Sequence, residues 1–477
     1  MDVLKKAASP TGHGALWLAA TAFLLGGLAA LIWCLVALPP AYRWAPLAGT
    51  VFSWVLFGAA IVSLRRIPAK MMTAVVVSGA LLLGVAAVSG PPATSSDSAR
   101  YAWDGIVQKN GISPYRYVPA DPTLKSLRPS WLFQDRDLGG PCPRGLYPAN
   151  TTAEGAANPA DLPGSAGLCT AINRPQVPTI YPAVGEIYFL TVRLLPGPSV
   201  GYIAFQLTGL ALSLVLTAGL LIFLHRTSRA PHFAAWWAWS PLVLFEAVNN
   251  AHVDVLGAVL ATAAVLLLFR GKVHSSALVF GAAVATKLVP VILAPGLLYR
   301  RPLRFTLTAA LTFVILYLPY MLISGWAVIG YLPGYLTEEG YNGGESRRFT
   351  LLKIVVPDGW ATPTGVVLLL LISAYVWRTV DPARPWDKQV VMVGATLLIA
   401  SPGYPWYALL LVPLIALSGR FEYFGIPVAL TIMYLSAGQL DGESTARAVL
   451  IAVSIMILTA AWFRKHRAAP PTSLMSP

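Results

Sequence analysis

Charged residues are scarce in this chain. Asp, Glu, Lys and Arg make up 11% of its 477 residues, whereas hydrophobic residues make up 56%. Soluble domains carry about 25% charged residues, so an ordinary soluble domain is excluded. Apolar stretches long enough to cross about 30 Å of hydrocarbon, about 20 residues each, recur along nearly the whole sequence. Strands of a membrane barrel would alternate every second residue. We therefore predict an all-α, polytopic integral membrane protein.

Cysteine is also rare, and three residues are too few for a disulfide framework. Cys34 lies in an apolar run, and we interpret it as a small buried residue. Cys142 and Cys169 both lie in a long polar segment, where they can pair if the segment faces an oxidising exterior. The sequence alone leaves this pairing open.

The net charge of +14 does not predict a nucleic-acid partner. Basic residues form short clusters between apolar spans rather than one basic face. In membrane proteins such clusters mark the cytoplasmic connections. The clusters are Lys5-Lys6, Arg65-Arg66-Lys70, Arg226-Arg229, Arg270-Lys272, Arg300-Arg301-Arg304, Arg378-Arg384-Lys388, Arg420 and Arg464-Lys465-Arg467.

If all of these clusters lie on the cytoplasmic side, the sequence divides into about fourteen apolar segments with both termini cytoplasmic. This predicts about 12 to 14 transmembrane helices. The segments are expected at about residues 14–37, 46–64, 71–89, 200–224, 232–248, 253–269, 275–287, 288–299, 304–324, 362–377, 389–401, 405–418, 424–437 and 445–463.

This topology divides the chain into N-terminal transmembrane helices (1–89), an extracytoplasmic loop (90–198), a transmembrane helical core (199–467) with an outer loop (325–361), and a disordered tail (468–477). A loop as long as 90–198 is uncommon unless it is functional or disordered. Its middle, 138–175, is rich in Gly, Pro, Ala and Asn, which predicts irregular structure, whereas 181–195 is expected to form a helix lying in the interface.

The segment from Gly90 to Tyr117, GPPATSSDSARYAWDGIVQKNGISPYRY, is the strongest candidate for an active site. It opens the polar loop and places several chemically active side chains just past an apolar span: Asp97, Arg100, Tyr101, Trp103 and Asp104. Both acids are also compatible with solvated loop positions, and Asp97 with a helix cap. A general base must lie near the membrane surface to deprotonate an incoming hydroxyl. Asp97 fits this better, and Asp104 stays an alternative.

A second polar cluster follows an apolar span in the segment FEAVNNAHVD. It comprises Glu246, Asn249, Asn250, His252 and Asp254 at an expected outer turn. Ionisable residues at the ends of apolar spans are costly and mark functional sites, although a hydrated turn is the simpler alternative. His252 and Asp254 are two residues apart and no third ligand stands near, so we expect no zinc site.

Three further segments carry candidates for binding an anion or a sugar. Lys287 precedes Pro290 in an interrupted apolar stretch, where a lysine either reaches the interface or neutralises an anion. Arg347 and Arg348 are adjacent in an outer loop and suit a phosphate, unless they form ion pairs within the loop. Trp406 lies in SPGYPWY, at a level where an aromatic belt is expected in any case.

Together these segments resemble the GT-C superfamily of membrane glycosyltransferases, and within it the actinobacterial polyprenyl-phosphate-mannose-dependent α-mannosyltransferases. The matching pieces are DSARYAWDGIVQKNGISPYRY, the YP of YPAVGEIYF, NNAHVD, TKLVPVILAP and SPGYPWY, in this order between residues 97 and 407. The resemblance implies a many-helix enzyme of the cell membrane whose active site faces away from the cytoplasm. It also implies an acidic catalytic base in the first large outer loop, which on this chain is Asp97. Ala183 replaces the family's second Pro after the YP.

The resulting hypothesis is transfer of a mannosyl residue, with inversion, from polyprenyl-phosphate-mannose to a hydroxyl of a cell-envelope glycan or glycolipid. Asp97 would be the general base. Lys287, Arg347 or Arg348 would meet the charge on the leaving phosphate. The other expected substrate-binding residues are Arg100, Tyr101, Asp104, His252, Asp254 and Trp406. Because the phosphate is a competent leaving group, neither a cofactor nor a metal is expected.

Two alternatives stay open at this point. An arabinosyltransferase would use the same machinery with a lipid-phosphate pentose. A lipid-linked sugar flippase or transporter would instead hold its ionisable residues near mid-membrane and show related halves.

Overall fold

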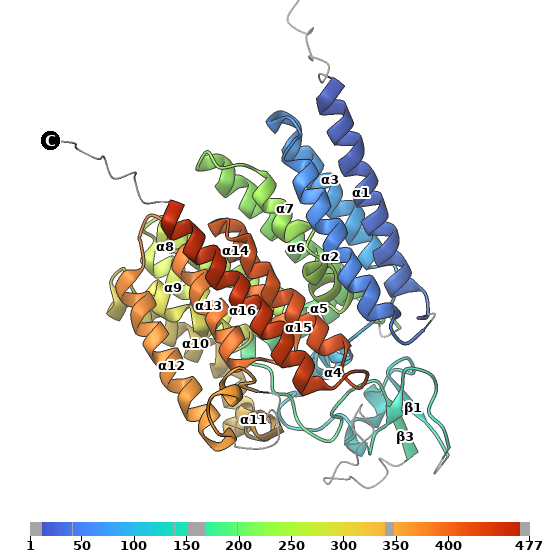
Figure 1. Cartoon of the computed structure of the whole chain (residues 1–477). Helices are drawn as coiled ribbons and strands as arrows, with labels where there is room; N and C mark the ends of the chain where they lie inside the picture. Colours follow the sequence, from blue (N-terminus) through green and yellow to red (C-terminus); the bar gives the residue numbers. More distant parts are fainter. Residues whose placement is uncertain are drawn as a thin grey trace, which may run out of the picture.

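The computed structural model describes residues 12–40, 42–137, 140–150, 167–197, 199–338 and 348–467. Helices dominate it, which confirms the all-α prediction (Figure 1). The α-helices are α1 (Gly12–Ala37), α2 (Ala45–Leu64), α3 (Ala69–Ala87), α4 (Asp97–Lys109), α5 (Ala183–Leu194), α6 (Ile203–Arg226), α7 (His232–Ala238), α8 (Asp254–Phe269), α9 (Val273–Thr286), α10 (Pro302–Ser324), α11 (Leu332–Glu338), α12 (Asp358–Thr379), α13 (Trp386–Ala400), α14 (Val412–Ser418), α15 (Gly425–Leu435) and α16 (Gly442–Arg467).

Shorter helical turns connect several of these helices. Most are 3-10 turns, and one is a π-helix, η3 (Val243–Asn249). The 3-10 turns are η1 (Pro122–Leu127), η4 (Val289–Leu297), η5 (Gly325–Ile329), η6 (Leu352–Ile354), η7 (Pro405–Leu410) and η8 (Phe421–Phe424).

Among the described residues, seven helices are long and apolar enough to cross a membrane, and an eighth span is possible where η3 and α8 meet at a bend of 112°. The chain is therefore a multi-pass membrane protein. Three further expected segments are present as shorter apolar helices, at Val273–Thr286, Pro405–Ser418 and Phe421–Leu435, so fewer segments have the length of a full crossing than the sequence predicts.

Proline explains where expected helices are divided. The segment 232–248, predicted as one helix, is broken between α7 and η3 just before Pro241. Pro290 and Pro295 lie within 288–299, which forms the 3-10 turn η4 instead of an α-helix. Proline has no N–H to donate, and its ring clashes with the carbonyl four residues earlier. Both breaks lie beside residues that the sequence singles out as functional candidates.

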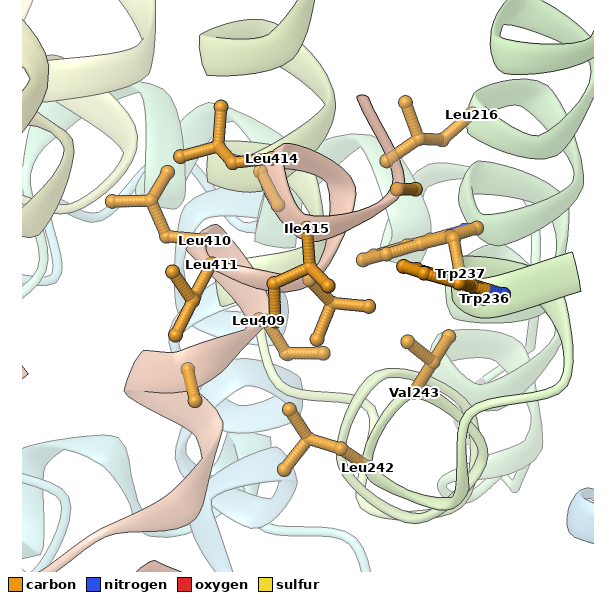
Figure 2. Packing of buried hydrophobic residues seen from close by; sticks show 14 of the residues in the cluster. Leu216, Trp236, Trp237, Leu242, Val243, Leu409, Leu410, Leu411, Leu414 and Ile415 are labelled. Atoms are coloured by element: carbon orange, nitrogen blue, oxygen red, sulfur yellow. The ribbon is translucent and has the colours of Figure 1, made fainter. Parts of the chain in front are cut away.

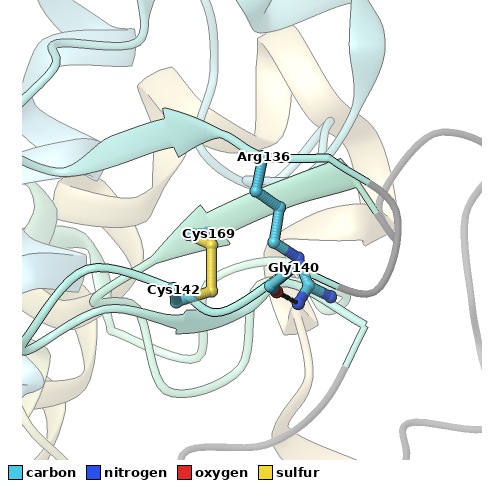
Figure 3. The surroundings of a disulfide bond; sticks show 4 residues. All are labelled: Arg136, Gly140, Cys142 and Cys169. Carbon is cyan, nitrogen blue, oxygen red and sulfur yellow. Dashed lines mark hydrogen bonds between the residues drawn. A yellow bond between two sulfur atoms is a disulfide. The ribbon is translucent and has the colours of Figure 1, made fainter.

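The polar loop holds a small antiparallel sheet of order β1-β3-β2, formed by β1 (Phe133–Asp135), β2 (Tyr147–Pro148) and β3 (Leu168–Thr170). The expectation of wholly irregular structure over 138–175 was therefore wrong for the described part. Cys142 and Cys169 form a disulfide that fastens β3 to the chain before β2 (Figure 3). Cys34, expected to be buried, is exposed on α1.

Buried apolar side chains pack the η7–α14 segment against α7. Leu409 and Ile415 of the η7–α14 segment face Trp236 and Trp237 of α7 (Figure 2). Lipid tails are as apolar as leucine, so close packing rather than removal from water holds such helices together. Indole N–H groups add polar ties, since Trp237 Nε1 donates to the Ser213 carbonyl oxygen of α6 at 3.1 Å.

The polar loop and α11 lie together at one end of the helical bundle, and α16 ends at the opposite end (Figure 1). The α4 and α5 helices pack against each other beneath the loop. The expected tail 468–477 lies outside the described residues.

Candidate active site

A cavity of about 1320 Å³ opens at the loop end of the bundle. Its polar wall comes from the start of α4 and from the strand-following segment 171–177. Its apolar walls come from the end of α1 (Leu35 to Pro40) and from η4 (Val289 to Ile292). The cavity therefore joins polar groups to surfaces that suit a lipid chain. The lining includes five of the sequence-predicted site residues: Asp97, Arg100, Lys287, Arg348 and Trp406.

Two asparagines at the end of η3 hold the chain that leads to Asp97. The amide Nδ2 of Asn249 donates to the carbonyl oxygen of Ala87 at 3.0 Å, and its Oδ1 accepts from the N–H of Ala93 at 2.9 Å. Asn250 Nδ2 donates to Thr94 Oγ1 at 2.7 Å. The two polar clusters found in the sequence, about 150 residues apart, are thus brought together by hydrogen bonds between α3, the start of the loop and η3.

Asp97 is the first residue of α4, and its side chain is 16% exposed. The preceding Ser96 is the N-cap residue, so Asp97 does not cap the helix. Asn173 Nδ2 donates to Asp97 Oδ1 at 3.0 Å, and Oδ2 lies 3.5 Å from Nδ1 of His252. Neighbours therefore hold both carboxylate oxygens at the edge of the cavity.

His252 is fully buried and does not line the cavity. Its Nε2 lies 3.3 Å from Glu246 Oε2, and its ring stacks on Trp406 with centroids 4.0 Å apart. Trp406 in turn stacks on Tyr404 at 4.6 Å. The structure thus places His252 behind Asp97, rather than in contact with the contents of the cavity.

Lys287 forms a close ion pair with Asp254 at the site. Its Nζ lies 2.7 Å from Asp254 Oδ2, and 4.8 Å from the centroid of the Tyr407 ring. Lys287 follows α9 in an extended conformation, just before the prolines of η4. Arg348 is 4% exposed and lines the same cavity. Arg347 lies outside the described residues.

Residues 179–402 match the model of glycosyltransferase family 87. The matched part contains Glu246, His252, Asp254 and Lys287, whereas Asp97 precedes it and Trp406 follows it. Searches of curated proteins and of solved structures found no match. The family 87 match, with the apolar spans, supports a membrane-bound glycosyltransferase acting on a sugar donor and an acceptor.

Two further candidates of the first loop, Arg100 and Tyr101, lie outside the part matched to family 87, and their contacts hold α4 in place. Arg100 Nη2 donates to the carbonyl oxygen of Val177 at 2.7 Å, which ties α4 to the segment after β3. Tyr101 is fully buried and stacks on Phe189 of α5 with centroids 4.4 Å apart. Of these two residues, only Arg100 reaches the cavity.

Asp104 is buried away from the cavity, and its Oδ1 lies 4.0 Å from Nη1 of Arg100. Loss of water on burial raises its pKa to about 6, while the charge of Arg100 acts in the opposite direction. Burial, and then the neighbouring Asp104, raise the pKa of Glu186 well above its ordinary value. Glu186 also accepts from Thr179 and Gln108, at 2.6 and 2.8 Å. These two acids form a buried pair beneath the site.

Sequence reasoning missed two residues of the polar wall, Asn173 and Arg174. Arg174 Nε lies 2.7 Å from Glu338 Oε2 of α11, and so links the loop to the far side of the cavity mouth. The signal for both was weak, because the segment follows a two-cysteine region that we expected to be irregular. Among the described residues, no group of three or more His, Cys, Asp or Glu is arranged to hold a metal ion.

Proposed function

We propose that this protein transfers a mannosyl residue from polyprenyl-phosphate-mannose to a hydroxyl of a cell-envelope glycan or glycolipid, on the outer face of the cell membrane. The observation that carries the proposal is the position of Asp97. Its carboxylate reaches a cavity that has cationic side chains and apolar walls, and that is large enough for a sugar and part of a lipid. The match to family 87 supports the reaction class.

In the proposed reaction Asp97 removes the proton from the acceptor hydroxyl as that oxygen attacks the anomeric carbon. The bond from this carbon to the lipid phosphate breaks on the opposite face, and the phosphate leaves with the bonding electrons. A β-linked donor then gives an α-linked product. General base catalysis of this kind contributes about 10²- to 10⁴-fold, so Asp97 is the residue whose loss should matter most.

Asp97 is preferred over Asp104 as the base because only Asp97 lines the cavity. Asp104 is 2% exposed and faces Arg100. A base must come within hydrogen-bond reach of the proton that it removes. Asp104, with Tyr101, therefore contributes to binding by shaping α4 against α5 rather than by touching the acceptor.

The charge that develops on the departing phosphate needs cationic partners, and electrostatic stabilisation of this kind is often the largest catalytic contribution. Lys287 and Arg348 line the cavity and fit this role, and Arg347 stays a candidate on the adjacent position. Asp254 holds the Lys287 ammonium at 2.7 Å. We assign Asp254 to positioning Lys287 rather than to direct contact with the donor.

The aromatic wall suits the sugar itself. Trp406 lines the cavity and is 5% exposed, with Tyr404 stacked against it. Trp406 stacks on His252 and on Tyr404, so the Tyr404 ring, which also lines the cavity, offers the apolar face to the C–H groups of a sugar ring. Arg100 belongs to the same lining, and its N–H groups can donate to the sugar hydroxyls. Donor specificity for mannose over a pentose would be set between the Trp406–Tyr404 stack and Arg100.

The test is transfer of radiolabelled mannose from polyprenyl-phosphate-mannose in membranes that carry the intact protein, Asp97→Asn or Asp104→Asn at matched expression. We expect transfer by the intact protein, loss of about 10²-fold or more with Asp97→Asn, and a much smaller loss with Asp104→Asn. The reverse pattern would assign the base to Asp104. Transfer from the arabinose donor alone would show that the transferred sugar is a pentose and would leave the assignment of the site unchanged. Inactivity with both donors would contradict the proposal and favour a flippase.

A further inference from the structure

His252 lies at a sharp bend of the chain within the bundle. The π-helix η3 and α8 meet there at 112°, and the preceding Ala251 has a left-handed φ of 57°. Such a conformation is uncommon for alanine and costs energy. The turn aims a fully buried imidazole between two acids rather than into water.

Both ring nitrogens of His252 face carboxylates. Nδ1 lies 3.5 Å from Asp97 Oδ2, and Nε2 lies 3.3 Å from Glu246 Oε2. A neutral imidazole has one N–H donor, and its other nitrogen would point a lone pair at a carboxylate. The imidazolium has a donor for each acid. Both contacts are within ion-pair distance but neither has hydrogen-bond geometry, so a charged ring would hold the two acids by electrostatic attraction.

Amides close both ends of this row. Asn173 Nδ2 donates to Asp97 Oδ1 at 3.0 Å, and Asn250 Nδ2 donates to Glu246 Oε2 at 2.9 Å. Asn250 also binds Thr94, three residues before Asp97. The row Asn173, Asp97, His252, Glu246 and Asn250 thus joins the loop, α4 and η3 through polar contacts alone.

Only the Asp97 end of the row reaches the cavity, since neither His252 nor Glu246 lines it. Other charged and titratable groups face Asp97 from the surrounding elements. These groups are the ammonium of Lys287, which is paired with Asp254; the guanidinium of Arg174; and the phenols of Tyr101, Tyr181 and Tyr404. Among the described residues, Glu246 is the carboxylate that contacts His252 on the side away from the cavity.

We infer that Glu246 keeps His252 charged, and that the charged ring positions Asp97 as the base. When Asp97 accepts the acceptor proton, its own negative charge disappears. Without Glu246 the imidazolium would then be left buried with no counter-charge, which costs several kcal/mol in a protein interior. Glu246 is thus a permanent counter-ion, and both it and His252 are positioning residues. This inference rests on the proposed function for its kinetic consequence.

The kinetic test compares the pH–rate profile of the intact protein with those of Glu246→Gln and Glu246→Asp. Gln keeps the shape and an acceptor oxygen but removes the charge, so the alkaline limit of transfer should move to lower pH by about one unit. It should also lower kcat about 10-fold or more with little change in KM. Glu246→Asp should restore part of both. A Gln variant with the intact profile would overturn the inference.

Glu422→Gln is the matched control. Glu422 is also a buried acid, 1% exposed, and it pairs with Arg464 of α16 away from the cavity. We expect its loss to lower the thermal unfolding midpoint and to leave the pH–rate profile unchanged. An equal shift in both Gln variants would show a general effect of removing buried charge and would contradict a specific role for Glu246.

A second readout needs no transfer activity. The unfolding midpoint of the intact protein should exceed that of His252→Gln by an amount that shrinks as pH rises and the ring loses its proton. In a Glu246→Gln background the same difference should be small and insensitive to pH. If the intact protein transfers no sugar, the proposed function fails and this measurement still decides the inference: a pH-independent difference in both backgrounds would refute it.

Discussion

The ammonium of Lys287 and the carboxylate of Asp254 lie 2.7 Å apart, although both were expected to bind substrate separately. Their side chains are 16% and 7% exposed, so the pair is largely withdrawn from water. Removing one partner of a buried ion pair leaves an uncompensated charge and costs about 3 to 5 kcal/mol. The pair therefore couples the geometry of the site to the stability of the α8–α9 region.

This pair gives the first prediction. Asp254→Asn should lower the unfolding midpoint and weaken transfer, because Lys287 loses its position. Lys287→Gln in addition to Asp254→Asn should recover most of the stability but none of the transfer, since the cation itself is needed at the phosphate. Unfolding midpoints and initial rates of the intact protein and of these two variants test this. Recovery of transfer in the double variant would remove Lys287 from the reaction.

The second prediction concerns the contact between α6 and η3. A Cβ atom added at Gly209 would lie 2.1 Å from the carbonyl oxygen of Ala247, which is backbone and cannot move aside. Gly209→Ala should therefore displace η3, with Glu246 upon it, and lower both the unfolding midpoint and transfer. Gly219→Ala on the same helix meets nothing within 4 Å and serves as the control. It should be neutral or slightly stabilising.

Equal effects at the two glycines would contradict this account, because both lie in α6 and differ in what a methyl group would meet. Loss of transfer at an unchanged midpoint would show that a displacement of η3 too small to unfold the protein is enough to disturb the base.

The disulfide between Cys142 and Cys169 supports the third prediction. It closes a chain separation of 27 residues, and a loop of that size contributes about 3 to 4 kcal/mol in the chain-entropy description. The strand β3 continues into Asn173, which binds Asp97. Replacing both cysteines by serine should make the loop easier to cleave with protease and should lower transfer. Cys34→Ser, at an exposed position on α1, should change neither.

Much of the bundle was predictable because hydrophobic runs and proline act locally. Expected bounds for α1, α2 and α10 agree with the structure to within about two residues, the usual scatter of helix ends. The sequence also indicated both halves of the site, but it did not show that Lys287 would pair with Asp254 or that His252 would lie behind Asp97. Those facts depend on how distant helices meet, and no local pattern encodes that.

Asn173 is a site residue that the sequence did not indicate at all. Its role at Asp97 depends on a three-stranded sheet and a disulfide in the polar loop. Strands of two or three residues carry too short a pattern to detect by alternation. The sequence around Asn173 therefore does not predict that its side chain faces Asp97.

The last prediction uses the buried pair of Asp104 and Glu186. Burial raises the pKa of Asp104 to about 6, against an ordinary value of about 3.9. The fold thus favours the protonated acid. Its stabilising effect is complete below the pKa of the unfolded chain and is lost as pH rises through about 6. Glu186 shifts in the same direction, again chiefly by burial, and so extends the loss to higher pH.

The unfolding midpoint of the intact protein in lipid–detergent micelles should therefore fall as pH rises from about 4 through about 6, and Glu186 should extend the fall to higher pH. Asp104→Asn cannot ionise, so its midpoint should fall less over this range and should equal or exceed that of the intact protein at the higher pH. Asp135→Asn is the control, because Asp135 is 70% exposed in its pair with Lys125. If Asp104→Asn keeps the full pH dependence, the titrating group lies elsewhere, and Glu186→Gln then shows whether the other member of the pair carries it.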